Sequence, residues 1–110
     1  MHLNEMQKFC RQLLSRVAYP RIGTLVGLQE EIGKMAKIIM DIEIYGRPID
    51  KKVIEKECSE LFFSFIDLCN SYDIEIERVS QSRIKEIKKK INKWEKEHGE
   101  ILKEKRNKFD

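Results

Sequence analysis

The sequence predicts an all-α fold, and three observations support this. Charged residues make up 37% of the 110 residues while only five are Gly and two are Pro, a composition typical of long solvated helices. Apolar residues recur at spacings of three and four, the period of one helix face. The only alternating segment, Ile74 to Glu77, is short and continues directly into a helical pattern. Regular three-four steps predict helices packed nearly parallel or antiparallel, as in a bundle.

The first two helices are separated by Pro20 and Gly23. The first is predicted over 3–17, where apolar residues from Met6 to Val17 follow helical spacing. The second is predicted over 24–45, with Thr24 as its N-cap. Its apolar stripe consists of Leu25, Leu28, Ile32, Met35, Ile39 and Ile42.

The third helix follows the break at Gly46–Pro48, and Asp50 is expected to cap its N-terminus. It is expected to be the most buried helix, because a second set of apolar residues widens its stripe. These stripe residues are Ile54, Cys58, Leu61, Phe62, Phe65, Ile66, Leu68, Cys69 and Tyr72. So many apolar positions on one helix indicate a further partner surface.

The fourth helix is expected to begin between Asp73 and Glu75 and to end near Gly99, although Ile101 and Leu102 could extend its pattern. Its stripe of Ile84, Ile87, Ile91 and Trp94 is interpreted as core. We expect one helical domain over 1–102, followed by a charged tail over 103–110 that frays.

Composition and charge exclude several classes of protein. The net charge is only +3, with +5 in residues 83–110 and −2 in residues 1–82. The Lys88–Lys90 run lies between Ile87 and Ile91 with glutamates nearby, which favours a solvated helix face over a nucleic-acid surface. Three cysteines without metal-ligand spacing and two histidines argue against zinc or a disulfide framework. No apolar run is long enough to span a membrane and no leader pattern stands at the start, so we expect a cytoplasmic protein.

The residues that carry a chemical signal lie along the edges of the second and third helices. Glu57 and Glu60 are three residues apart, so they project from one helix face beside the apolar stripe. Two carboxylates at such partly buried positions raise each other's pKa, and a divalent cation would remove that repulsion. Oxygen ligands without Cys or His suit Mg²⁺ or Mn²⁺. The alternative is that both are ordinary solvated residues.

Two segments together resemble the MazG-like family of all-α nucleoside triphosphate pyrophosphohydrolases. The sequence reads Leu28-Gln29-Glu30-Glu31-Ile32-Gly33-Lys34-Met35-Ala36 on one helix and Glu57-Cys58-Ser59-Glu60-Leu61 on the next. The family pattern is E-E-x-G-E-x-A followed by E-x-x-D, and the resemblance covers roughly residues 22–87. It implies a four-helix bundle completed by dimerisation, as a homodimer or homotetramer. It also implies a Mg²⁺-dependent enzyme that converts a nucleoside triphosphate to the monophosphate and pyrophosphate.

The resemblance assigns roles to five residues of this sequence. Glu31, Glu57 and Glu60 would hold Mg²⁺ or Mn²⁺, with Glu60 standing where the family has Asp. Lys34 stands where the family has a second Glu and so opposes metal binding; it can pair with a neighbouring Glu in the metal's place, or contact phosphate. Arg83 corresponds to a basic residue that the family uses near the phosphates.

Two functions therefore follow from the sequence. The first is a Mg²⁺-dependent nucleotide pyrophosphohydrolase of reduced activity, in which Glu31, Glu57 and Glu60 are the catalytic residues. The second is a catalytically inactive MazG-like helical dimer that serves as a nucleotide-binding or protein-interaction module, and Lys34 is the reason to consider it. Nucleic-acid binding through residues 83–110 is a weaker third hypothesis, which a steep dependence on salt would support.

Overall fold

A computed structural model describes residues 1–17 and 19–110 of the chain, and all of the regular structure in those ranges is helical. Four helices follow one another along the chain: α1 (Leu3–Leu14), α2 (Arg21–Glu43), α3 (Lys51–Ser71) and α4 (Ile76–Phe109). The predicted all-α class is confirmed. In the described ranges, no helix combines the length and apolar character needed to cross a membrane.

The chain divides into two compact units, Met1–Ile76 and Glu77–Asp110. The first holds α1, α2 and α3, whereas the second consists of α4 after its first residue. The predicted helical domain over 1–102 with a charged tail over 103–110 remains a prediction.

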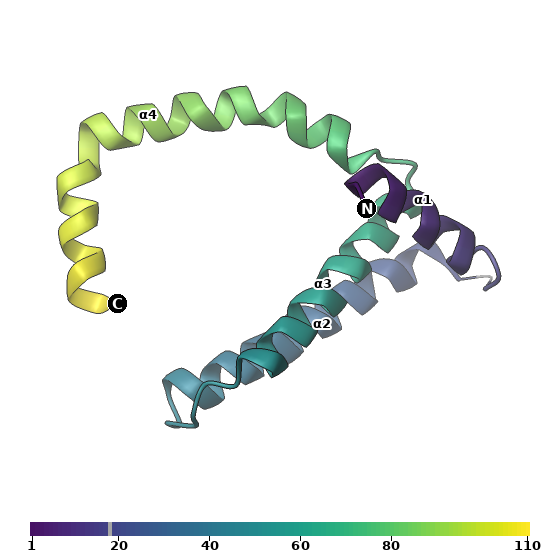
Figure 1. Ribbon diagram of the computed structural model, residues 1–110, viewed down its shortest axis with the longest axis horizontal. Helices are drawn as coiled ribbons and strands as arrows, with labels where there is room; N and C mark the ends of the chain where they lie inside the picture. The colour runs from purple at the N-terminus through teal and green to yellow at the C-terminus, as the bar shows by residue number, and fades with distance from the viewer. Residues whose placement is uncertain (18) are drawn as a thin grey trace. The chain divides into compact units, whose positions relative to one another are not determined.

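Within the first unit, α2 and α3 lie side by side as a helical hairpin (Figure 1) and α1 packs on α3. Short connections favour such antiparallel neighbours. The turn after α2 contains Gly46 at φ +70°, a left-handed conformation that glycine adopts without steric cost. Asp50 then accepts a hydrogen bond from the Lys52 amide at 3.1 Å, so the predicted N-cap of α3 is confirmed.

The core is small and lies where α1 meets the end of α3. Its buried residues are Cys10, Ile66, Cys69 and Ile76, and Ile66 is fully buried. Gln7 is also buried and joins α1 to the α3–α4 connection: its side-chain amide donates to the Ile74 carbonyl, and its side-chain oxygen accepts from the Ile76 amide at 3.1 Å. More residues are buried on α3 than on any other helix among the described residues, as predicted.

Several predicted helix ends are wrong. Helix α1 ends at Leu14 rather than Val17, and α2 begins at Arg21 with Pro20 as its N-cap. Thr24 therefore lies inside the first turn of α2, where its hydroxyl donates to the Arg21 carbonyl at 2.6 Å. Proline fixes its own φ angle and lacks an amide hydrogen, so it is well suited to the start of a helix, and α2 begins directly after Pro20. Helix α2 ends at Glu43 rather than Tyr45, and α4 begins at Ile76, just after the predicted range.

Gly99 does not end the last helix, which continues to Phe109. One glycine inside a helix costs only about 1 kcal/mol, and the Lys, Glu, Leu and Arg residues on either side favour helix strongly. The charged residues 103–109 are thus helical; their fraying remains a prediction.

Two core assignments are also wrong. Trp94 is 60% exposed, and Ile84, Ile87 and Ile91 on the same stripe of α4 are about half exposed. Cys58 is exposed, whereas Cys69 is buried as predicted. Helical spacing identifies an apolar stripe, but burial requires a second surface to cover it.

Candidate metal centre

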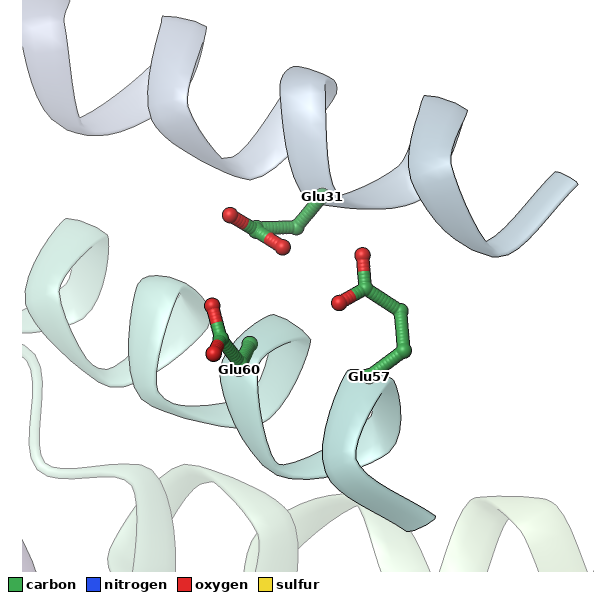
Figure 2. Close-up of side chains that lie close together, drawn as sticks. All are labelled: Glu31, Glu57 and Glu60. Carbon is green, nitrogen blue, oxygen red and sulfur yellow. The ribbon is translucent and has the colours of Figure 1, made fainter. Parts of the chain in front are cut away.

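Three glutamates from two helices converge in the first unit. Glu31 projects from α2, and Glu57 and Glu60 project from α3, with their carboxylates directed towards one another (Figure 2). One oxygen atom from each lies within 4.8 Å of the others. The hairpin produces this convergence, because α2 and α3 pack side by side and the i, i+3 spacing of Glu57 and Glu60 places both on one face of α3.

The three carboxylates differ in their access to water. Glu57 is 7% exposed, the Glu31 side chain is 13% exposed, and Glu60 lies on the solvent side. The buried oxygens Glu31 Oε2 and Glu57 Oε1 have no hydrogen-bond partner. Buried polar atoms are nearly always satisfied in native proteins, so these two carboxylates have oxygens that a cation or a proton could satisfy.

The pKa of Glu57 is raised above its ordinary value. Burial away from water is the main cause, and the adjacent Glu31 carboxyl adds to it through hydrogen bonding and repulsion. Glu60 acts in the same direction, whereas the Lys34 ammonium opposes the shift. The folded protein therefore favours the protonated form of Glu57 more than the unfolded chain does.

Lys34 is the one cation in contact with the cluster among the described residues. Its Nζ atom lies 3.3 Å from Glu31 Oε1, and its side chain is 61% exposed. The carboxylates raise the pKa of Lys34, first through the hydrogen bond and charge of Glu31 and less through Glu57 and Glu60, so the ammonium stays charged. The expected pairing with Glu31 is therefore present, but it leaves Glu31 Oε2 and Glu57 Oε1 without a partner.

A groove of about 370 Å³ adjoins the cluster. It is lined by Lys34, Lys37 and Lys56, by Ile38 and Val53, and by the two glutamates of α3. The volume is within the range of small-molecule sites, and lysine ammonium groups are common phosphate ligands. Carboxylates beside lysines form a donor set that suits a metal ion together with an anionic ligand.

Lys37 and Lys56 were not predicted from the sequence. A signal for them was present: Lys37 is three residues after Lys34, and Lys56 precedes Glu57 directly, so both adjoin predicted site residues. Only the pairing of α2 with α3 places the three lysines around one groove.

Arg83 belongs to the second unit, where its guanidinium pairs with Glu86 on the same helix. Its expected contact with phosphates stays a prediction. The other four predicted site residues, Glu31, Lys34, Glu57 and Glu60, lie together.

No family model, curated protein or solved structure matches this chain. Membership of the MazG-like family therefore stays a prediction, which depends on the spacing of the site residues.

Proposed function

We propose that Glu31, Glu57 and Glu60 bind one divalent cation, Mg²⁺ or Mn²⁺, and that the protein is a nucleotide pyrophosphohydrolase of reduced activity. The reaction would convert a nucleoside triphosphate to the monophosphate and pyrophosphate. The observation that carries the proposal is the pair of buried oxygens without a partner, Glu31 Oε2 and Glu57 Oε1, in carboxylates that converge with Glu60. A hard cation with oxygen ligands satisfies both.

The charge of the site supports one divalent ion. Three carboxylates and the Lys34 ammonium together carry a net charge of minus two when all are ionised. A bound Mg²⁺ offsets that charge, polarises phosphate oxygens and lowers the pKa of a bound water. The lysines of the adjoining groove, Lys34, Lys37 and Lys56, would hold the negative charge of the phosphates.

Each residue of the proposed site then has a defined role. The buried carboxylates of Glu31 and Glu57 are positioned by the hairpin, and the exposed Glu60 closes the cluster on the solvent side. Cleavage at the α–β linkage requires the phosphates on either side of this linkage to lie against the three glutamates. The remainder of the phosphate chain would then lie along the lysine groove. Lys34, which touches both the cluster and the groove, would neutralise phosphate oxygens next to the ion.

The second candidate is an inactive MazG-like helical dimer that binds nucleotides or another protein. The contact between Lys34 and Glu31 favours it, because an ammonium at 3.3 Å lowers the affinity of the cluster for any cation. A homodimer or homotetramer fits either candidate, since many large apolar side chains of α1 and α3 are exposed, among them Phe9, Leu13, Phe63 and Phe65.

The test is calorimetric titration of the full chain with Mg²⁺ and with Mn²⁺, with and without a nonhydrolysable nucleoside triphosphate, alongside an assay for pyrophosphate release. Glu57→Gln should abolish metal binding and turnover, because it removes a ligand charge while keeping the shape of the side chain. Glu55→Gln is the matched control, since Glu55 lies on the same helix with its side chain 64% exposed. Its metal binding and turnover should equal those of the unmodified protein.

The outcomes separate the two candidates. Metal-dependent release of pyrophosphate that Glu57→Gln abolishes supports the enzyme. Nucleotide binding without turnover supports the inactive module. No metal binding by the unmodified chain, with or without nucleotide, refutes the metal centre itself.

A further inference from the structure

The second unit of the chain carries an exposed apolar stripe. Ile84, Ile87, Ile91 and Trp94 follow steps of three and four along α4, and Ile101 continues the series after His98. The isoleucines of this series are 47–59% exposed and Trp94 is 60% exposed. Such spacing is the heptad pattern of a coiled coil, with Ile84, Ile91 and His98 at a positions and Ile87, Trp94 and Ile101 at d positions.

The charged residues that flank this stripe are divided by sign. In the first half of the helix, the flanking e and g positions are basic: Arg83, Lys88 and Lys90. In the second half the charged residues at these positions are acidic, Glu95, Glu97 and Glu104, and Leu102 occupies the remaining e position. The e and g residues of a coiled coil pair across the interface and set the orientation of the helices.

From this division we infer that α4 pairs with α4 of a second copy of this chain, in antiparallel orientation. An antiparallel pair places each a residue opposite a d residue, so Ile91 packs on the second copy's Trp94 and Ile84 on its Ile101. The flanking contacts then join e to e and g to g. Lys88 meets Glu95 of the second copy, Lys90 meets Glu97, and Arg83 meets Glu104.

A parallel pair is disfavoured by the same residues. There each g residue meets the e residue five positions later in the second copy, which places Arg83 against Lys88. Lys90 against Glu95 is favourable, but Glu97 would meet Leu102 and gain no charge partner. The antiparallel arrangement has three attractive pairs, each occurring twice by symmetry, and no repulsive pair.

The inner charges are available for such pairing. In the part of the chain that the structure describes, Lys88, Lys90 and Glu95 have no ion-pair partner. Glu97 contacts Lys93 at 4.0 Å and His98 at 3.7 Å, both on its own helix and both weak. Helix α4 bends in its last third (Figure 1), so the outer contacts, Ile84 with Ile101 and Arg83 with Glu104, also need this bend to straighten.

The test measures self-association of the full chain by sedimentation equilibrium together with the fluorescence of Trp94, the single tryptophan. Trp94 moves from solvent to an apolar interface on pairing, so its emission should shift to shorter wavelength as concentration rises. Lys88→Glu replaces two attractive contacts per dimer by two repulsive ones and should raise the dissociation constant about tenfold. Lys89→Glu is the matched control: it makes the same change in net charge at an f position, away from the interface, and should leave the constant unchanged.

A second pair of variants tests the orientation. Glu95→Lys alone should weaken pairing as Lys88→Glu does, and the combination of Lys88→Glu with Glu95→Lys should restore it. Tighter pairing by Lys88→Glu would indicate the parallel arrangement and overturn the proposal. Equal effects of the Lys88 and Lys89 variants on the dissociation constant would assign association to another surface. A chain that stays monomeric and has short-wavelength Trp94 emission would show that its own first unit covers the stripe. Either result overturns the proposal. None of these outcomes depends on metal or nucleotide binding.

Discussion

Lys34 provides the sharpest test of the metal centre. Its Nζ atom lies 3.3 Å from Glu31 Oε1, and the three carboxylates lie within 4.8 Å of one another, so a cation held among them would be about 5 Å from the ammonium. Even at the dielectric constant of water, one unit charge about 5 Å from a divalent ion changes its affinity roughly tenfold or more. Lys34→Glu changes the charge by two units and adds a carboxylate ligand.

The expected result is a graded series. Lys34→Met removes one positive charge and should raise Mg²⁺ and Mn²⁺ affinity roughly tenfold, whereas Lys34→Glu should raise it on the order of a hundredfold. Lys37→Met is the matched control, because Lys37 lines the same groove one helical turn further on. It should leave metal affinity nearly unchanged and weaken triphosphate binding.

Calorimetric titration of the three variants with Mn²⁺ measures these affinities, and circular dichroism establishes that each variant keeps its helical content. Increases of the predicted size in both Lys34 variants would support a cation held by the three glutamates. Equal metal affinity in Lys34→Met, Lys34→Glu and the unmodified protein would refute this reasoning, because the charge would then lie too far from any bound ion. Absence of metal binding in a folded Lys34→Glu protein would refute the metal centre.

Three further predictions concern pH, packing and thiol reactivity. Without metal, the raised pKa of Glu57 stabilises the fold most below the pKa that Glu57 has in the unfolded chain, and this stabilisation is lost as pH rises through the folded pKa. The melting temperature of the unmodified protein relative to that of Glu57→Gln should therefore fall across this pH window. A constant difference between the two melting temperatures would contradict the raised pKa. Ile66→Ala should lower the free energy of unfolding in urea by about 2–5 kcal/mol, because Ile66 is fully buried, whereas Ile49→Ala, at a position 71% exposed, should have little effect. A thiol reagent should modify Cys58 first; faster reaction of Cys10 or Cys69, both buried with pKa values raised by burial, would contradict the described packing.

The sequence predicts local features of this fold well and features that depend on distant packing less well. Asp50 is a correct N-cap because capping involves only a side chain and an amide two residues away, here Lys52. Gly99 and Trp94 show the limit. The helix continues through Gly99 because the neighbouring residues favour helix. Trp94 was predicted to be buried but is exposed, because helical spacing identifies an apolar face without identifying what covers it.

The candidate site shows the same division. Helical spacing placed Glu57 and Glu60 at the edge of one stripe, but it could not distinguish the buried Glu57 from the exposed Glu60. That difference arises from the position of α2 across α3, which also brings Glu31 into the cluster. Lys37 and Lys56 were missed for the same reason, since only this helix pairing gathers them into a groove.

A proton and a divalent cation are alternative partners for the same two carboxyls. Hydrogen bonding with Glu31 raises the pKa of Glu57, so one proton held between them would satisfy the oxygens that otherwise have no partner. Lys34 takes neither place, since it contacts the other oxygen of Glu31 from the solvent side. A cation that binds Glu31 and Glu57 must displace that proton, so its affinity should increase as pH rises through the raised pKa of Glu57. The lysine substitutions change metal affinity through charge, whereas pH changes it through this exchange. If the cation binds at Glu31 and Glu57, its affinity must therefore change both with the lysine substitutions and with pH. A cation whose affinity changes with the lysine substitutions alone binds elsewhere in the groove.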